Sequence, residues 1–340
     1  MRTSLLSFLL TLFTITCLFA QDQSFEFGSK ETLTLSFGSC NRQNLAQPLW
    51  QPIIDHNPDL FMFLGDNIYG DTDDMQILKD KYQIQKNHPD YKELREQMPV
   101  IGVWDDHDYG KNDAGKEYAY KEESQQLFLD FFDVPAEDER RERKGAYSSY
   151  DVKWKSHTIR LILLDGRYHR DSLERIDRVY QVNQEGTILG EEQWSWLEGE
   201  MSDKDVSLFI IASGIQMIPE DHNYEKWANF PQERQRLLSL IQEKKPKGTL
   251  LLSGDRHIAE ISRLDIKDLD YPLVEVTSSG LTHTWNNAPQ EPNRHRLGEL
   301  VSDLNYGIIK IEEKQEGLSI EAEIRGKDQE LLHFVTISMN

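Results

Sequence analysis

The chain has 340 residues, of which 38% are hydrophobic and 29% charged, and its formal net charge is −21. This composition is that of a globular protein and excludes disordered, collagen-like and coiled-coil chains, and the length suits one large α/β domain. A strongly negative surface repels phosphate backbones and anionic lipid, so broad nucleic-acid binding and docking on acidic membranes are not expected. A protein of this charge that binds anions must concentrate positive charge or metal ions locally.

Residues 1–20 have the pattern of a secretory signal peptide, with Arg2 ahead of an apolar run over residues 5–20 and a polar Gln21 after it. The run is short for a stable membrane span, and an uncleaved anchor is the alternative. No later stretch is long and apolar enough to cross a membrane. We therefore expect a secreted or periplasmic protein without a membrane span after cleavage, in which residues 21–340 form a single domain.

The chain has two cysteines, Cys17 and Cys40. Cleavage of the signal would remove Cys17, so Cys40 would have no partner for an internal disulfide. A lone thiol in an oxidising compartment is open to oxidation unless it is buried or bound. Cys40 is therefore an inert buried residue, a nucleophile or a metal ligand.

Seven short strands are predicted, and each ends in a polar or glycine-containing segment. They cover residues 32–37, 60–64, 100–104, 159–164, 206–212, 249–252 and 273–276. Short apolar strands indicate a sheet that is buried on both faces, and ligands of such sheets bind beyond the carboxyl ends of the strands. Seven polar ends in one chain favour one shared site.

Helical patterns separate these strands at residues 45–54, 118–132 and 191–200 and again from Pro231 onward. Residues 137–144 form a mixed-charge run that is typical of a solvated loop. The segments 307–311, 318–324 and 331–337 indicate a C-terminal β meander. No internal repeat and no Gly/Ser-rich linker interrupts the pattern.

The strand ends carry the residue types that two-metal hydrolysis of a phosphoester requires. Such a site needs a carboxylate that bridges two cations, further ligands for each cation, and an acid near the leaving oxygen. Asp66 is suited to bridge, although Gly-Asp after a strand is also a common helix cap. His107 is the candidate proton donor. The other candidate ligands are Cys40, Tyr69, Asp106, Asp255 and His257.

Taken in order, these segments resemble the metallophosphoesterase superfamily, and more closely its alkaline phosphatase D (PhoD-like) branch. The motifs are Phe-Gly-Ser-Cys at 37–40, Gly-Asp-Asn-Ile-Tyr at 65–69, Trp-Asp-Asp-His-Asp at 104–108, Ser-Gly-Asp-Arg-His at 253–257 and Ser-Ser-Gly-Leu-Thr-His-Thr-Trp at 278–285. The resemblance covers residues 32–310. It implies an α/β four-layer sandwich, with two packed mixed β-sheets flanked by helices and an active site at the carboxyl ends of strands.

The resemblance also implies a ferric ion, Fe³⁺, held by Cys40, Tyr69 and His257, with Asp66 bridging to a second metal. Gly-Asp-x-x-Tyr also looks like the purple acid phosphatase motif, in which the tyrosine binds ferric iron. An anionic phenolate and a thiolate both suit a trivalent cation. The alternative for Tyr69 is an aromatic residue packed at a helix start.

The second metal site implied by the resemblance takes Asp66, Asp106 and Asp255. An all-oxygen set favours a hard cation. In PhoD-like enzymes that cation is calcium, so we expect one iron with one or two Ca²⁺ ions, and other divalent metals are alternatives.

The activity implied is hydrolysis of phosphomonoesters or phosphodiesters by a metal-bound hydroxide, with His107 acting on the leaving group and Asp108 as a further catalytic residue. Arg167, at a strand end, is expected to clamp the phosphate with its planar guanidinium. The late histidine of the superfamily has no obvious counterpart here, and Gln216, which stands in that region, is a candidate ligand or phosphate contact. Further candidates for contact with a small phosphorylated substrate, each with a structural role as the alternative, are Asn41, Asn67, Lys111, His169 and His283.

A basic cluster at residues 294–296 would either guide anions to the site or form surface ion pairs. Two other functions remain open. A phosphodiesterase for a wall polymer, a lipid headgroup or nucleic acid would use the same metals, with loops 109–117, 171–190 and 218–230 setting the substrate. A non-catalytic secreted metal-binding protein is the third hypothesis. Such a protein is expected to have lost a ligand residue, and none is missing.

Overall fold

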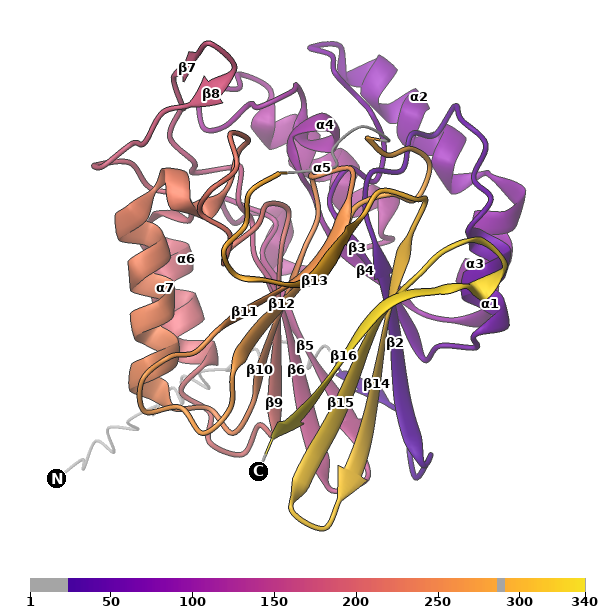
Figure 1. Ribbon diagram of the computed structural model, residues 1–340. Helices are drawn as coiled ribbons and strands as arrows, with labels where there is room; N and C mark the ends of the chain where they lie inside the picture. The colour runs from indigo at the N-terminus through magenta and orange to yellow at the C-terminus, as the bar shows by residue number, and fades with distance from the viewer. Residues whose placement is uncertain (1–23, 286–290, 340) are drawn as a thin grey trace, which may run out of the picture.

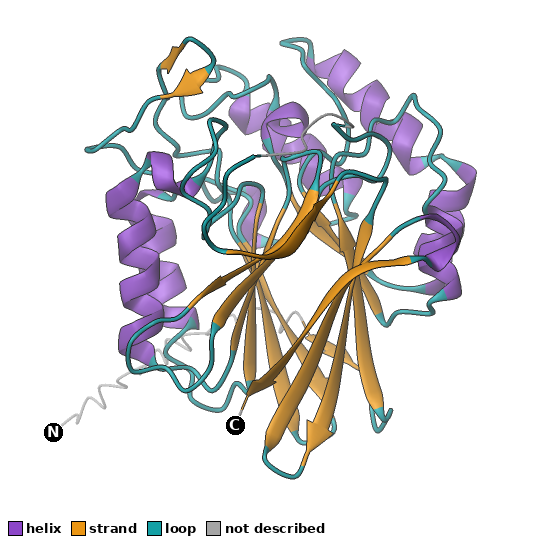
Figure 2. Ribbon diagram, in the orientation of Figure 1, coloured by secondary structure: helices purple, strands orange, loops and turns teal. Residues whose placement is uncertain are grey.

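Two mixed β-sheets pack face to face in the computed structural model, which describes residues 24–285 and 291–339 (Figure 1). Helices cover the outer face of each sheet, so the layers run helix, sheet, sheet, helix (Figure 2). This is the predicted four-layer α/β sandwich. The predicted signal peptide and Cys17 lie outside the described residues. None of the described helices has the length and apolar character that a bilayer span requires.

One sheet has eight strands and the other has six. In spatial order, the eight are β1 (Ser24–Glu26), β5 (Ser148–Trp154), β6 (His157–Leu163), β9 (Leu208–Ser213), β10 (Thr249–Ser253), β12 (Leu273–Ser278), β11 (Ala259–Leu264) and β13 (Arg296–Val301). The six are β16 (Leu331–Met339), β15 (Gly317–Arg325), β14 (Tyr306–Lys314), β2 (Thr32–Gly38), β3 (Leu60–Leu64) and β4 (Val100–Val103). A separate hairpin pairs β7 (Arg175–Ile176) with β8 (Val179–Tyr180).

Part of each sheet is parallel, which brings several strand ends together. In the six-stranded sheet β2, β3 and β4 are parallel, and in the other β6, β9, β10 and β12 are parallel. These are the seven strands predicted from sequence, each within two residues of its predicted ends. They divide between the two sheets, so the shared site lies where the carboxyl ends of both sheets meet.

The helices pack on the outer faces of the sheets. Their bounds are α1 (Trp50–Asp55), α2 (Met75–Lys86), α3 (Pro89–Gln97), α4 (Asp106–Tyr109), α5 (Lys121–Phe131), α6 (Gly190–Glu200) and α7 (Pro231–Lys244). Side chains of α6 and α7 share a buried cluster with the outer face of the eight-stranded sheet. Side chains of α1, α2, α3 and α5 do the same for the six-stranded sheet.

The continuous apolar run of β3 follows from this layering. Leu60, Met62 and Leu64 face the core between the sheets, whereas Phe61 and Phe63 face the helices. Because successive strand residues point to opposite faces, a strand that is covered on both faces has no polar position. Burial of both faces makes β3 a rigid support for the Gly-Asp segment that follows it.

The C-terminal meander is confirmed, since β14, β15 and β16 pair antiparallel in sequence order. Sequence patterns did not predict α2, α3, β5, β11 or β13. The mixed-charge run at 137–144 was predicted to be a solvated loop. Instead, Arg140 within it is buried and forms an ion pair with Asp138 through two hydrogen bonds. The missed helices α2 and α3 are rich in charge, and few of their residues are buried.

Candidate metal centre

The loops after β2, β3 and β10 bring four predicted ligands together. The Cys40 thiol donates to Asp66 Oδ2 over 3.4 Å, and the Tyr69 hydroxyl donates to the same oxygen over 3.2 Å. Cys40, Asp66 and His257 offer ligand atoms that all lie within 4.8 Å of one another. Sulfur, oxygen and nitrogen donors therefore converge on one point beside Asp66.

Two further groups of ligand atoms are linked to the first in series, each through one shared carboxylate. Asp66, Asp106 and His107 form one group, and Asp105, Asp106 and Asp255 form the other, each within 4.8 Å. Asp66 and Asp106 each belong to two groups. Neighbouring cations at this place would share carboxylate ligands, as two-metal sites do.

Asp105 is the member that the sequence analysis missed. It is the first acidic residue of Trp-Asp-Asp-His-Asp, and it caps the N-terminus of α4 with a capping box. The sequence feature that could have indicated Asp105 is its position directly before the predicted ligand Asp106 in this motif. Oδ2 of Asp105 has no hydrogen-bond partner among the described residues, so one carboxylate oxygen is left for a ligand role beside the cap.

The backbone is strained at four of these residues. The φ angles of Cys40, Asp66, Asp255 and His257 are 58°, 51°, 67° and 53°, which is the left-handed region that residues with a Cβ seldom adopt. Strain of this kind persists where the surroundings hold it, and it concentrates at functional sites. It lets each loop turn sharply, so that its side chain points back over the sheet ends.

Gly254 is required by the close approach of the two sheets. A Cβ on this residue would lie 2.2 Å from the carbonyl oxygen of Leu64 and 2.7 Å from Ser39 Oγ. The loop that carries Asp255 therefore packs directly on the end of β3. The glycine brings Asp255 close to Asp66, although the two follow strands of different sheets.

Burial and mutual repulsion oppose ionisation of most of these acidic groups, but at Asp106 the positive charges of His107 and Arg167 outweigh burial and lower the pKa to about 2. Burial, with the charge of Asp66, raises the pKa of the Cys40 thiol, and burial likewise raises the pKa of the Asp66 carboxyl. The pKa of Tyr69 rises mainly through burial, and that of Asp255 rises to about 7 for the same reason. Bound cations would favour the charged forms of these groups, in addition to the positive charges of His107 beside Asp66 and of Arg167 beside Asp105.

Several buried ligand-type atoms at this point have no hydrogen-bond partner among the described residues. They are Asp66 Oδ1, Asp105 Oδ2 and His257 Nδ1. Buried polar atoms are almost always satisfied, and an ion or water is the usual explanation for exceptions. The donor set fits metal ions: thiol, phenol, imidazole and carboxylate on one side, and carboxylates alone on the other.

Asp108 supports the ligand loops and is not placed to touch a substrate, in contrast to its predicted catalytic role. It is fully buried, and its Oδ1 accepts hydrogen bonds from the backbone N–H of Asp105 at 2.7 Å and of Asp66 at 3.2 Å. Its Oδ2 accepts from the Asn67 amide, which also donates to the carbonyl of Val103 at 3.0 Å. The amide nitrogen of Asn67, predicted to bind substrate, is therefore used within the fold.

Arg167 does not have the free guanidinium that phosphate clamping needs. Its side chain is 0% exposed, and it pairs with Asp105 at 2.6 Å and with Glu225 at 2.9 Å. Glu225 pairs in turn with the buried Arg170 at 3.0 Å. The guanidinium of Arg167, which the sequence analysis expected to bind phosphate, instead holds the candidate ligand Asp105 in place.

The remaining predicted substrate contacts divide into two sets. His283 lies on the centre, with its ring 4.5 Å from the ring of His257 and 5.2 Å from that of Tyr69. Asn41 is fully buried, and its amide nitrogen donates to the carbonyl of Asn67 at 3.2 Å, so it is used within the fold as that of Asn67 is. Of these two residues, His283 keeps the position that a substrate contact needs.

The other set is engaged elsewhere. The buried Gln216 amide donates to Glu260 at 2.7 Å and to Thr277 at 2.9 Å. Lys111 pairs with Asp73 at the surface, and His169 contacts the carbonyl of Lys144 at 3.2 Å. The basic cluster at 294–296 forms ion pairs, which was the alternative to guiding anions to the site. The pairs are Arg294 with Asp221, His295 with Glu220 and Arg296 with Glu260.

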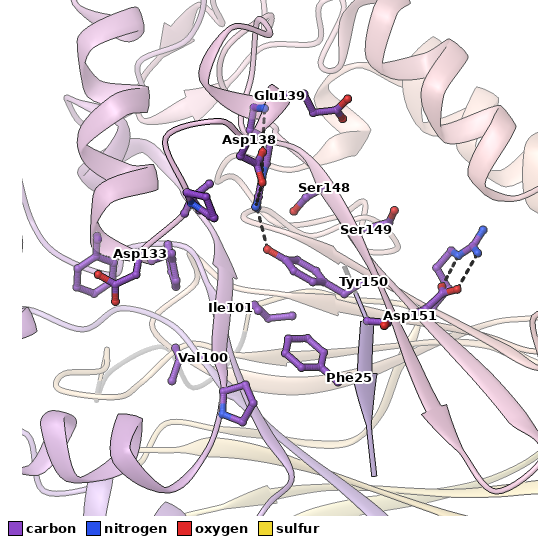
Figure 3. A pocket seen from close by; sticks show the side chains of 18 of the residues that line it. Phe25, Val100, Ile101, Asp133, Asp138, Glu139, Ser148, Ser149, Tyr150 and Asp151 are labelled. Atoms are coloured by element: carbon purple, nitrogen blue, oxygen red, sulfur yellow. Dashed lines mark hydrogen bonds and ion pairs between the residues drawn. The ribbon is translucent and has the colours of Figure 1, made fainter. Parts of the chain in front are cut away.

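A cavity of about 1260 Å³ lies away from this centre, between the edge strand β4 and the strands β1 and β5 (Figure 3). Phe25 forms part of its apolar wall, and none of the candidate ligands lines it. Its arginines already pair with acidic neighbours, Arg140 with Asp138 at 2.7 Å and Arg160 with Asp151 at 2.7 Å. It therefore offers no free positive charge to a phosphate.

We expect Asp66→Asn to abolish retention of bound metal while the protein stays folded, since the amide keeps the shape but removes the shared charge. Metal content after gel filtration, measured by elemental analysis, and circular dichroism check this. Asp59→Asn is the matched control, because Asp59 is a buried aspartate that pairs with Lys30 away from the centre. Equal metal content in the Asp66 variant and the wild type would contradict the site.

We expect Arg167→Met to lower the free energy of unfolding by about 3–5 kcal/mol, because two buried carboxylates would lose their partner. Denaturant unfolding measures this change. Arg236→Met removes a more exposed arginine that pairs with Glu191 and Glu198, and should cost less than about 1 kcal/mol. A loss of substrate affinity without a loss of stability would restore the phosphate-clamp interpretation.

Comparisons with known proteins agree with this fold. A family model for PhoD-like phosphatases matches residues 74–320, which include Asp106, Asp255 and His257 but not Cys40, Asp66 or Tyr69. Alkaline phosphatase D of Bacillus subtilis (strain 168) is 20% identical over 287 residues, which are 69% of this chain and 47% of that protein. The chain thus spans about half the length of this curated relative.

A solved structure of PhoD superposes with a TM-score of 0.72 at 16% identity, covering 92% of this chain and 72% of that chain. At this identity the likeness shows the fold. The match of the family model to most of the sequence shows the family. The chain belongs to the PhoD-like phosphatase family.

Proposed function

We propose that the protein is a secreted, metal-dependent phosphoric ester hydrolase that releases phosphate from organic phosphomonoesters, phosphodiesters or both. The observation that carries this proposal is the sharing of Asp66 and Asp106 among three groups of ligand atoms. Family membership supports the reaction class, and the apolar pattern of residues 1–20 supports export. We also propose that residues 21–340 form one domain, because no internal repeat and no Gly/Ser-rich linker interrupts the sequence pattern.

Cys40, Tyr69, His257 and Asp66 would hold a ferric ion. Carboxylates alone, from Asp66, Asp105, Asp106 and Asp255, would hold calcium or another hard divalent cation. When bound, such ions supply Lewis-acid polarisation of the phosphoryl group. The strained loops and the hydrogen bonds of Asp108 hold these side chains in place before substrate arrives.

His107 is the proton donor in this proposal. Its Nδ1 bonds to Asp71 at 2.7 Å, and its ring lies 4.2 Å from the ring of Tyr69. The carboxylate fixes the ring orientation, so Nε2 is the nitrogen left to protonate the leaving oxygen. The ring is partly exposed, which lets an ester reach it.

The test uses metal-loaded protein with p-nitrophenyl phosphate and its bis-ester. We expect hydrolysis of at least one, and a fall in kcat of about 10²–10⁴-fold in His107→Ala with the metal content unchanged. His169→Ala removes a histidine outside the centre and should leave kcat unchanged.

The relative rates on the two esters separate a monoesterase from a diesterase. If neither ester is hydrolysed by protein whose metal content has been verified, the enzyme proposal is wrong and the metal-binding alternative is favoured. Loss of metal in His107→Ala would instead make His107 a ligand.

A further inference from the structure

We propose that Arg42 binds the phosphoryl group of the substrate, in the role that sequence reasoning gave to Arg167. This inference rests on the proposed function. Arg42 follows Cys40 by two residues, and its backbone N–H donates to Thr282 Oγ1 at 2.9 Å. Thr282 Oγ1 donates to the Cys40 carbonyl at 3.0 Å, so the loops that carry Cys40 and His283 are tied together at Arg42.

The guanidinium lies at the edge of the metal centre. Its central carbon is 4.5 Å from the centroid of the Tyr69 ring, and the hydroxyl of that ring bonds to Asp66. Arg42 is only half-buried, whereas Arg167 is fully buried. Of the two arginines, Arg42 is the one that an anion from solvent can reach.

The guanidinium also has no acidic partner among the residues that the structure describes. Within residues 24–285 and 291–339, the arginines other than Arg42 and Arg178 all pair with a carboxylate. Arg178 is exposed in the turn between β7 and β8, where water can hydrate its charge in place of an acidic partner. A free arginine beside a buried centre, in a chain of net charge −21, has its planar fork available for two phosphoryl oxygens.

The test is calorimetric binding of inorganic phosphate to metal-loaded protein. We expect Arg42→Ala to weaken phosphate binding about tenfold to a hundredfold, the usual loss for a charged hydrogen-bonded partner, and Arg42→Lys to recover part of it. Arg178→Ala is the matched control and should bind as the wild type does. Metal content should be the same in all four proteins.

Phosphate binding by Arg42→Ala that equals that of Arg178→Ala would overturn the proposal. Loss of metal in Arg42→Ala would also overturn it, because Arg42 would then act by supporting Tyr69. The binding measurement does not need turnover. A chain that binds phosphate through Arg42 but hydrolyses neither ester would refute the proposed function and leave this inference standing.

A second observation indicates the class of leaving group. Trp285 is 47% exposed, and the other tryptophans of the described chain are buried or half-buried. Its backbone N–H donates to the carbonyl of His257 at 2.9 Å, and the rings of these two residues lie 6.0 Å apart. The edge of Tyr224 supports the indole at 5.4 Å, and Arg256 lies 4.1 Å over Tyr224.

We infer that Trp285 is a stacking surface for a planar leaving group, such as an aryl ring or a nucleobase. Aromatic side chains recognise such groups by their faces, and a base stacked on an aromatic ring contributes a substantial part of its binding. The ring is anchored to a candidate ligand loop, so the leaving group would lie next to His257.

We expect Trp285→Ala to lower kcat/KM for phenyl phosphate about tenfold to a hundredfold, with little change for glycerol phosphate, which has no ring to stack. Trp285→Phe should retain most of the aryl preference. Equal losses on both substrates, or no loss on either, would overturn the inference. Phenol binding, measured by the change in tryptophan fluorescence between wild type and Trp285→Ala, provides a readout when no ester is turned over.

Discussion

The structure depends on one constraint: four carboxyl groups, a thiol and a phenol are held together at the meeting point of two sheets. Asp66 lies at the centre of this group, with one oxygen bonded to Cys40 and Tyr69 and the other without a partner. Burying such groups without cations is unfavourable, because each is either desolvated as an anion or kept neutral at a raised pKa. The apolar core between the sheets must supply the stability that this cluster withdraws.

Behind the centre, hydrogen-bonded and ion-paired groups fix the loops. Asp108 bonds the backbones of Asp66 and Asp105, and Arg167 forms ion pairs with Asp105 and Glu225. Both oxygens of Asp108 accept hydrogen bonds, whereas Asp66 Oδ1 and Asp105 Oδ2 have no hydrogen-bond partner among the described residues. Supporting residues that hold the ligands in position are a common feature of metal centres.

The gathering of the candidate ligands could be predicted from the sequence because these residues follow strand ends. Once the apolar runs are assigned to parallel strands, the residues that follow them must gather at one edge, and Cys40, Asp66 and Asp255 do so. The division of strands between two sheets was predicted from the family resemblance and not from the apolar runs. A buried strand has the same apolar pattern in either sheet. The charged helices α2 and α3 were missed since few of their residues are buried.

Residue roles were harder to predict, because a role depends on which partners occupy a side chain. Arg167 and Arg42 both follow a strand, and the sequence does not show that buried carboxylates surround the first and not the second. The same holds for the acidic residues of one motif: a catalytic role was predicted for Asp108, which bonds the ligand loops, and none for Asp105, which lies in a group of ligand atoms.

The distribution of charge also bears on the kind of substrate that can reach the centre. A chain of net charge −21 repels a polyanion over its whole surface, and at physiological salt that repulsion acts within about 8 Å. The basic residues at 294–296 do not offset it, because acidic partners neutralise each of them. With the roles proposed above, attraction would be local, from metal ions held at the centre and from the guanidinium of Arg42. Such an attraction would favour a small ester whose single phosphoryl group fits between metal and arginine, and would disfavour a polymer that brings further phosphates close to the acidic surface.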